Sequence, residues 1–445
     1  MKITRLRKYS ILIGLLLMPK ALGAESVQGS GLLVGGEISS AIFETPAEAP
    51  SVELLVAEAL ERNPSVSALR ERLEAAHDMI APEGALPDPR VEIMMQGVDF
   101  PRITLGDAEM SMIGVQVSQE IPYAGKRRAR ESAARAELSV RAAELEELKG
   151  NLVTQVRFLY ARLYAIDQER KAQEIGRELL DMLSATVATR YSAGKAEQEA
   201  VIKAQLQFSR LKEKIIDLTS ERRTVIAALN RLLDRRGDSP LGAVLSVPDP
   251  VFSGESWETL AMENASAIRV KRAVLEAADR RLEVAKSNLN PDFSVGAGLF
   301  SRGDFDHVAT LQLGVEIPLW TRRKQRPLVR AAEHGLEMAR QDLLDAQASV
   351  RSEAARLAAE WERSNRQIRL YEEAIIPQTS AALDAARASY LAGRGDYSTV
   401  IEDFNLWLEA RVQLDRRKAD RYVAWAQLDF LVNPIAPSKQ GGPKP

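Results

Sequence analysis

Residues that could hold a metal ion are scarce in this chain of 445 residues. There is no cysteine, and the three histidines, His77, His307 and His334, lie far apart without a shared helix-face spacing. A tight transition-metal site needs several imidazole or thiolate ligands that converge. We therefore expect no metal site, and we interpret His307 as an exposed residue in the loop of a strand hairpin.

Motifs that would indicate catalysis or a bound cofactor are also missing. No Gly-x-Ser-x-Gly motif, Walker-type loop or paired-carboxylate pattern rises above chance. Gly296-Ala297-Gly298 lies within an expected strand, so it is not a nucleotide-binding fingerprint, which would connect a strand to a helix. We predict no catalytic residue, no cofactor and no enzymatic activity, and a secreted hydrolase is disfavoured.

The abundant charged residues are those of long helices. Alanine, leucine, arginine and glutamate dominate the composition, which is typical of long helices rather than of compact mixed domains. Most glutamates and arginines are best explained as solvated helix faces and ion pairs. Glu131, Glu144, Glu333 and Asp342 could instead line a tunnel, and the helix phase does not decide between these interpretations.

The elements that would position any functional residue occur twice. The segment from Asn63 to Leu233 returns from Asn264 to Val432 with the same order of parts. This repeat far exceeds a solenoid unit of roughly 20–50 residues, so it indicates a duplicated structural half. Matching positions are Pro87-Asp88 with Pro291-Asp292, Ile121-Pro122 with Ile317-Pro318, and Leu138, Leu145, Leu152 and Leu159 with Leu336, Leu343, Val350 and Leu357.

Each half contains one very long helix, expected over residues 125–191 and 321–390. Leucines at seven-residue spacing in the first predict left-handed supercoiling against neighbouring helices. Pro377 lies inside the second and should kink it. The shorter helices on either side of each long helix add up to nearly its length, which predicts a wall with two short helices stacked end to end against one long helix.

A strand hairpin precedes each long helix, at about residues 90–121 and 292–318. Its second strand alternates apolar and polar residues, as a sheet with one apolar face does. Four strands are too few for a barrel, and the open edges of a single sheet are not tolerated in lipid. Three copies would supply twelve strands, within the range of outer-membrane barrels. The alternative is a pair of soluble hairpins packed on a helical bundle.

The ends of the chain predict an exported protein. Residues 1–24 have the basic start, short apolar core and small-residue end of a cleaved signal peptide. We expect an extended arm at 25–50, a first repeat at 51–243, a second at 250–434 and a disordered tail at 435–445. No concentrated basic tract remains beyond the signal peptide, so nucleic acid is not an expected partner.

Two motifs carry a resemblance to a known family. The turn Leu383-x-x-Ala386-x-x-x-Tyr390-x-x-Gly393 is weakly echoed by Val187-x-x-x-Tyr191-x-x-Gly194. With the duplicated halves and the hairpins, it resembles the TolC family of outer membrane factors over about residues 51–434. Leu86-Pro87-Asp88-Pro89, combined with Pro122-x-x-Gly125-Lys126-Arg127, is similar to the subset of that family that serves heavy-metal and cation efflux.

This resemblance implies a mainly helical α+β fold. It implies a long α-helical barrel, or coiled-coil tunnel, in the periplasm. It also implies a homotrimer, whose three copies complete a transmembrane β-barrel in the outer membrane. It implies a passive exit duct for an inner-membrane pump, expected to be of the resistance-nodulation-division (RND) type, joined through a periplasmic adaptor protein. Metal cations are the expected cargo. Multidrug or type I protein export is the alternative, and a soluble periplasmic coiled-coil scaffold is a less favoured one.

In that family, the turns at the helix tips close the tunnel and dock the adaptor. Here these tip turns are Tyr191–Gly194 and Tyr390–Asp396, so the docking residues implied are Tyr191, Gly194, Tyr390 and Gly393. The family often has an aspartate where this chain has Ala200 and Thr399, which puts the usual aspartate constriction in doubt. The candidate aperture residues are therefore Asp396, Thr399, Glu402 and Asp403, although Asp396 would also suit a helix N-terminus.

Overall fold

The computed structural model describes residues 48–97, 110–250 and 257–433, all within one compact unit that begins at Pro46. The expected signal peptide, nearly all of the expected arm and the expected tail lie outside the described residues. None of the helices in the described ranges combines the length and apolar composition that a membrane crossing requires.

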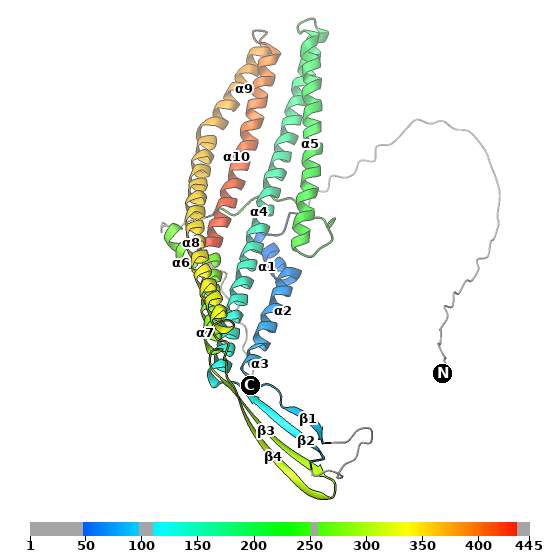
Figure 1. The fold of residues 1–445 in the computed structure, drawn as a ribbon. Helices are drawn as coiled ribbons and strands as arrows, with labels where there is room; N and C mark the ends of the chain where they lie inside the picture. Colours follow the sequence, from blue (N-terminus) through cyan, green and yellow to red (C-terminus); the bar gives the residue numbers. More distant parts are fainter. Residues whose placement is uncertain (1–47, 98–109, 251–256, 434–445) are drawn as a thin grey trace, which may run out of the picture. The chain divides into compact units, whose positions relative to one another are not determined.

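The first half begins with three short helices that lie along one long helix (Figure 1). Asn63 separates the first two because it caps the second: its Oδ1 accepts a hydrogen bond from Ser65 N at 2.9 Å, and Pro64 occupies the first helical position. The helices are α1 (Val52–Arg62), α2 (Pro64–Asp78), α3 (Ile80–Gly84), α4 (Ala124–Ser192) and α5 (Gln198–Leu232).

The second half repeats this order with one interruption. A π-helical turn, Tyr371–Ile375, stands just before Pro377. Proline lacks an amide hydrogen and its ring crowds the carbonyl four residues earlier, so the helix must change its hydrogen bonding there. The helices are α6 (Trp257–Asn264), α7 (Ser266–Ser287), α8 (Gln325–Leu370), α9 (Ile376–Leu391) and α10 (Tyr397–Val432).

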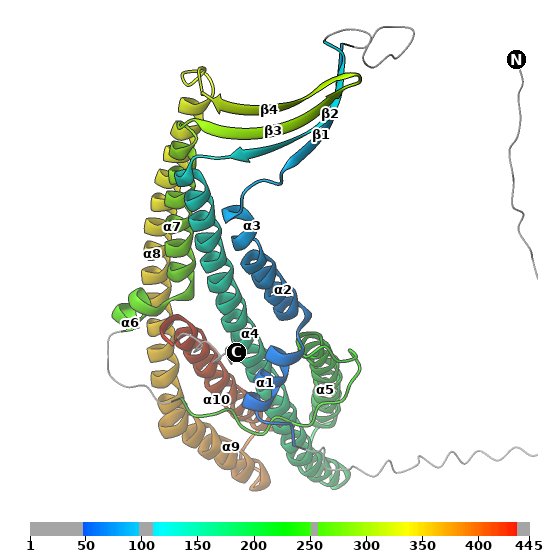
Figure 2. The same ribbon diagram turned by 90° about the horizontal axis from the view of Figure 1, so that it is seen from below.

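The helices pack side by side, with α4 contacting most of the others (Figures 1 and 2). Helices α1, α2 and α3 lie along one part of α4 and α5 along another, so two shorter stretches stack against one long helix as expected. Helix α7 lies between α4 and α8, and α10 packs on α4, α8 and α9. The heptad position Leu152 and the adjoining Val156 and Leu163 are buried in the main core cluster, which confirms a mainly helical fold.

A four-stranded antiparallel sheet in the order β1-β2-β3-β4 lies at one end of α4, α7 and α8 (Figure 2). The sheet joins the two halves because β2 pairs with β3, with Ile121 opposite Phe293. The expectation that His307 lies in a hairpin loop was wrong: Gly303 adopts a φ of +67°, which permits a tight turn, so His307 is already in β4. The strands are β1 (Arg90–Gln96), β2 (Met112–Ile121), β3 (Asp292–Arg302) and β4 (Phe305–Glu316).

The two faces of the sheet differ in chemistry. Apolar side chains share one face and are exposed: Val91, Ile93, Val115, Leu299, Leu311 and Leu313 have exposed fractions of 48–79%. The other face carries polar residues and glycines, and Gln116 bonds across Gly296 to Gln312 at 2.7 Å. The helices therefore do not cover the apolar face, and hairpins packed on a helical bundle are not the arrangement of the described residues.

A buried ion pair ties α4 and α5 to the segment that follows α5. Arg222 donates to Asp167 through Nε at 2.6 Å, and it also donates to the backbone carbonyls of Leu241 and Gly242 at 3.1 and 2.7 Å. The second oxygen of Asp167 accepts from Val244 N at 2.9 Å. Asp167 is only 8% exposed, so this carboxylate satisfies groups from two elements in a dry environment.

Candidate functional site

The two tip turns have the same backbone geometry. After α4, Lys195 N donates to Arg190 O and Gly194 N to Tyr191 O; after α9, Arg394 N donates to Ser389 O and Gly393 N to Tyr390 O. This is the Schellman pattern that ends helices with a left-handed residue. Gly194 and Gly393 have φ of +68° and +73°, so the glycines singled out from the sequence occupy positions that favour glycine.

Arg190 joins one tip turn to the other. Its Nη1 donates to the backbone carbonyl of Leu391 at 2.9 Å, and its guanidinium carbon lies 4.8 Å from the centroid of the Tyr390 ring. A second link lies further along the helices, where Gln207 on α5 donates to Asn405 on α10 at 2.6 Å. The tips of the two halves are thus held together by polar contacts between residues about 200 positions apart in the sequence.

Tyr390 is buried, whereas its first-half counterpart Tyr191 is exposed. Tyr390 packs against Tyr397 with ring centroids 5.4 Å apart, in an apolar cluster that includes Phe404 and Trp407. Burial raises the pKa of Tyr390, and it raises the pKa of Tyr397 to about 12. Both hydroxyls are buried without a hydrogen-bond partner in the described part of the chain, and the two rings act as packing residues of this cluster.

The candidate aperture residues gather near the start of α10. Asp396 is the N-cap residue but makes no side-chain capping bond. Thr399 and Glu402 are exposed, and Asp403 is half-buried. Lys203 of α5 reaches this group: it donates to Ser398 at 2.7 Å and pairs with Glu199, which raises the pKa of Lys203, with Asp396 and Glu402 adding to the effect. A lysine therefore partly balances the acidic residues.

A second cluster lies where the sheet joins the helices. The buried Lys126, at the start of α4, donates to Asp292 Oδ2 at 2.7 Å, and Tyr123 N donates to Oδ1 of the same carboxylate at 3.0 Å. Asp292 is the first residue of β3. This clasp, defined here as Lys126 with Asp292, fixes the end of β3 against the helix that follows β2.

Next to the clasp, the polar face of the sheet forms a hollow of about 350 Å³. Its charged lining residues are Asp88, Arg90, Glu92, Glu120, Asp292 and Glu316. Five of these six are carboxylates, so the surface attracts cations in general. Within the described ranges, no group of three or more histidine, aspartate or glutamate side chains is arranged to hold a metal ion.

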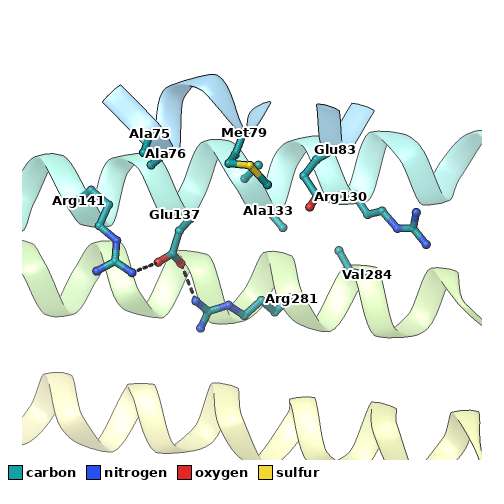
Figure 3. Close-up of a pocket in the computed structure, with 11 residues that line it drawn as sticks. Ala75, Ala76, Met79, Glu83, Arg130, Ala133, Glu137, Arg141, Arg281 and Val284 are labelled. Carbon is teal, nitrogen blue, oxygen red and sulfur yellow. Dashed lines mark hydrogen bonds and ion pairs between the residues drawn. The ribbon is translucent and has the colours of Figure 1, made fainter. Parts of the chain in front are cut away.

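A larger hollow of about 580 Å³ lies between α2, α4 and α7 (Figure 3). Glu137 accepts hydrogen bonds from Arg141 at 2.7 Å and from Arg281 at 2.6 Å, and thereby links α4 to α7. Alanines and Met79 supply much of the remaining wall. Through these two ion pairs the arrangement forms a packing contact between α4 and α7.

One carboxyl group between the helices makes stability depend on pH. Burial and the neighbouring Glu144 raise the pKa of Glu147 above its ordinary value of 4.5, partly offset by Lys271. The folded protein therefore favours protonated Glu147, and this contribution is lost as pH rises through the folded-state pKa. We expect Glu147→Gln to raise the unfolding temperature at neutral pH but not below pH 4.5.

Thermal unfolding between pH 4 and 8 measures this difference, with Glu178→Gln, an exposed glutamate of α4, as the matched control. A Glu147→Gln effect of the same size at every pH would contradict the assignment.

A family model described as "Outer membrane efflux protein" matches residues 55–235 and 257–433. The fold is similar to that of the outer membrane protein VceC from Vibrio cholerae, with a TM-score of 0.73 and 17% identity over 86% of this chain and 96% of that one. It is also similar to CusC (TM-score 0.73, 16% identity, 87% and 93% coverage) and to the outer-membrane channel OprN (0.73, 16%, 86% and 90%). A search of curated protein sequences finds no match.

Proposed function

The chain belongs to the outer membrane efflux protein family, and we propose that it is the passive exit duct of a tripartite efflux assembly. An inner-membrane pump supplies the energy, a periplasmic adaptor joins the pump to the duct, and this protein provides the path to the exterior. Such a role needs a wall, a lumen and docking ends, and it needs no catalytic group.

The observation that carries the proposal is the sheet with one exposed apolar face and one polar face. In the proposed assembly the apolar face meets outer-membrane lipid and the polar face lines the lumen. Strands β1 and β4 each leave one edge unpaired, which lipid does not tolerate. Three copies that pair these edges form a twelve-stranded barrel, and their helices form the tunnel wall in the periplasm.

The tip turns are the proposed docking ends for the adaptor, with Tyr191, Gly194, Tyr390 and Gly393 as their defining residues. The support is geometric. Both turns end a helix pair far from the sheet (Figure 1), and both present backbone in the same left-handed conformation. The proposed aperture residues are Asp396, Thr399, Glu402 and Asp403, with Lys203 reducing the net negative charge beside them.

Metal cations are the proposed cargo, delivered by a pump of the RND type. The support is the excess of carboxylates on the polar face of the sheet, because a negatively charged wall raises the local concentration of cations. A duct that carried anionic or neutral molecules would gain nothing from this charge.

Growth of a deletion strain tests the proposal. The strain is grown on graded zinc, cobalt, cadmium, copper and silver salts, and in parallel on a panel of dyes and antibiotics. We expect sensitivity confined to metals, restored by the intact gene. Sensitivity to dyes and antibiotics instead would keep the duct and overturn the cation cargo, and normal growth on every compound would count against an efflux role.

A further inference from the structure

The internal duplication extends to the pairing of individual strand residues. From the first half to the second, Asp88 shifts by 204 to Asp292, and Ile121 by 196 to Ile317. The shift of 204 carries Arg90 of β1 to Ser294 of β3, and the shift of 196 carries Ser118 of β2 to Gly314 of β4. Arg90 pairs with Ser118 in the first hairpin, and Ser294 pairs with Gly314 in the second. The two hairpins therefore share one register under the shifts that the sequence repeat defines.

The pairing of β2 with β3 has no counterpart inside the chain, because β1 and β4 lie at opposite edges of the sheet. The shift of 196 carries β2 forward to β4, and the shift of 204 in reverse carries β3 back to β1. The counterpart of the β2–β3 pairing is therefore a pairing of β4 with β1, and it needs β1 of a second copy. We propose that β4 pairs with β1 of a second copy of this chain in the register that places Val315 opposite Val91, Leu313 opposite Ile93 and Glu316 opposite Arg90.

This register follows from the observed pair Ile121 and Phe293, whose shifted positions are Ile317 and Pro89. It also keeps the chemistry of each face continuous. Val315 and Leu313 belong to the exposed apolar face, as do Val91 and Ile93, whereas Glu316 and Arg90 belong to the polar face. A slip of one residue would break this continuity because it turns every side chain to the other face.

Charge distinguishes between the registers that keep apolar side chains on one face of the sheet and polar side chains on the other. Moving β1 by two residues in one direction places Glu316 opposite Asp88, and moving it by two in the other direction places Glu316 opposite Glu92. Like charges directly opposite one another destabilise a strand pair, and opposite charges stabilise it. Only the register derived from the duplication gives Glu316 a cation, and within its own chain Glu316 lies opposite another carboxylate, Asp292.

The clasp supports the same contact. Lys126 holds Asp292 inside the chain, and the shifts that relate the halves carry Asp292 to Asp88 and Lys126 to Arg322. Asp88 and Arg322 are both exposed, and neither has an ion pair in the part of the chain that the structure describes. In the proposed pairing, Arg322 of one copy reaches Asp88 of the next, so the second clasp is complete only between copies.

The proposal rests on the proposed function, in which copies share one barrel, and adds the residues that meet at the seam. Cysteine cross-linking tests it, since the chain has no native cysteine. Val315→Cys with Val91→Cys, and Leu313→Cys with Ile93→Cys, place thiols directly opposite one another. Two exchanged variants use the same four positions but join residues that are displaced by two along the strands. They are Val315→Cys with Ile93→Cys, and Leu313→Cys with Val91→Cys.

Directly opposite Cβ atoms in a strand pair lie about 4.5–5.5 Å apart, so a small backbone shift brings them to the about 3.5–4.5 Å of a disulfide. Displaced Cβ atoms lie about 7–8 Å apart and are too distant for such a shift. We expect oxidation in outer membranes to link the first two variants into covalent trimers and to leave the exchanged variants mostly unlinked. Two intact strands separate β1 from β4 within one chain, so the disulfide cannot form intramolecularly.

Native mass spectrometry of each unoxidised variant reports assembly separately. Trimers with cross-links in the exchanged variants would overturn the register and leave the duct standing, whereas monomers throughout would overturn both. As an independent arm, Glu316→Arg and Arg90→Glu should each reduce the fraction of trimer that survives heating, and the double variant should regain it. A double variant no better than the weaker single one would overturn the Glu316–Arg90 pair.

Discussion

Valine at both Gly194 and Gly393 is expected to abolish export while trimers still assemble in the outer membrane. Both glycines have positive φ, which a β-branched residue adopts only with strain of about 1–3 kcal/mol. A Cβ at Gly194 would meet no atom within 4 Å, and one at Gly393 would meet only Arg190 Nη2 at 3.6 Å. The effect therefore comes from the backbone of the tip turns and not from a clash with the core.

Complementation of the deletion strain measures export, and native mass spectrometry of the extracted protein measures trimers. Asparagine at both positions is the matched control, because it tolerates the left-handed region and should retain most export. Gly335→Val adds a second control, since Gly335 lies in α8 with nothing within 4 Å of an added Cβ. Normal export in the double valine variant would mean that the tip turns are not the docking ends.

Asp167→Ala should cost the protein about 3–5 kcal/mol of stability, the largest effect we expect from a single side chain. The change leaves the half-buried Arg222 without its carboxylate and the backbone N of Val244 without an acceptor. Removing one partner of a buried ion pair is far more destabilising than breaking an exposed pair, because an uncompensated charge stays in the interior. The connection between α5 and the following segment should then loosen first.

The matched control is Asp238→Ala. Asp238 also pairs with an arginine, Arg236, but both side chains are more than 70% exposed. That loss should cost less than about 1 kcal/mol. The thermal midpoint of the detergent-extracted protein, followed by circular dichroism, compares the two variants. Equal midpoints would contradict the structural role assigned to Asp167.

Features that repeat along the chain could be predicted from the sequence. Alternation with period two determines which side chains share a face, so the apolar face around Leu311 and Leu313 follows from the residue order alone. Leucines at seven-residue spacing indicate long helices that pack against one another, because this spacing keeps the leucines on one helix face. A glycine after an expected helix indicates a left-handed end, as found at Gly194 and Gly393.

Contacts between distant segments could not be predicted. Arg190 binds the backbone carbonyl of Leu391, and a carbonyl has no sequence signature. Lys203 meets Asp396 and Glu402 only because α5 and α10 lie close together at the tips. His307 lies in β4 and not in the hairpin loop because that strand already begins at Phe305. The aperture residues remain a prediction.

The shared backbone of the tip turns has a consequence for recognition. Each copy presents two helix-pair ends that match in main-chain geometry and differ in side chains, because Tyr390 is buried and Tyr191 is exposed. In the proposed trimer these ends alternate around the ring, so main-chain atoms repeat with sixfold pseudosymmetry and side chains only with threefold symmetry. A partner that reads the backbone can occupy every end equally, whereas one that reads the tyrosines can occupy only every second end.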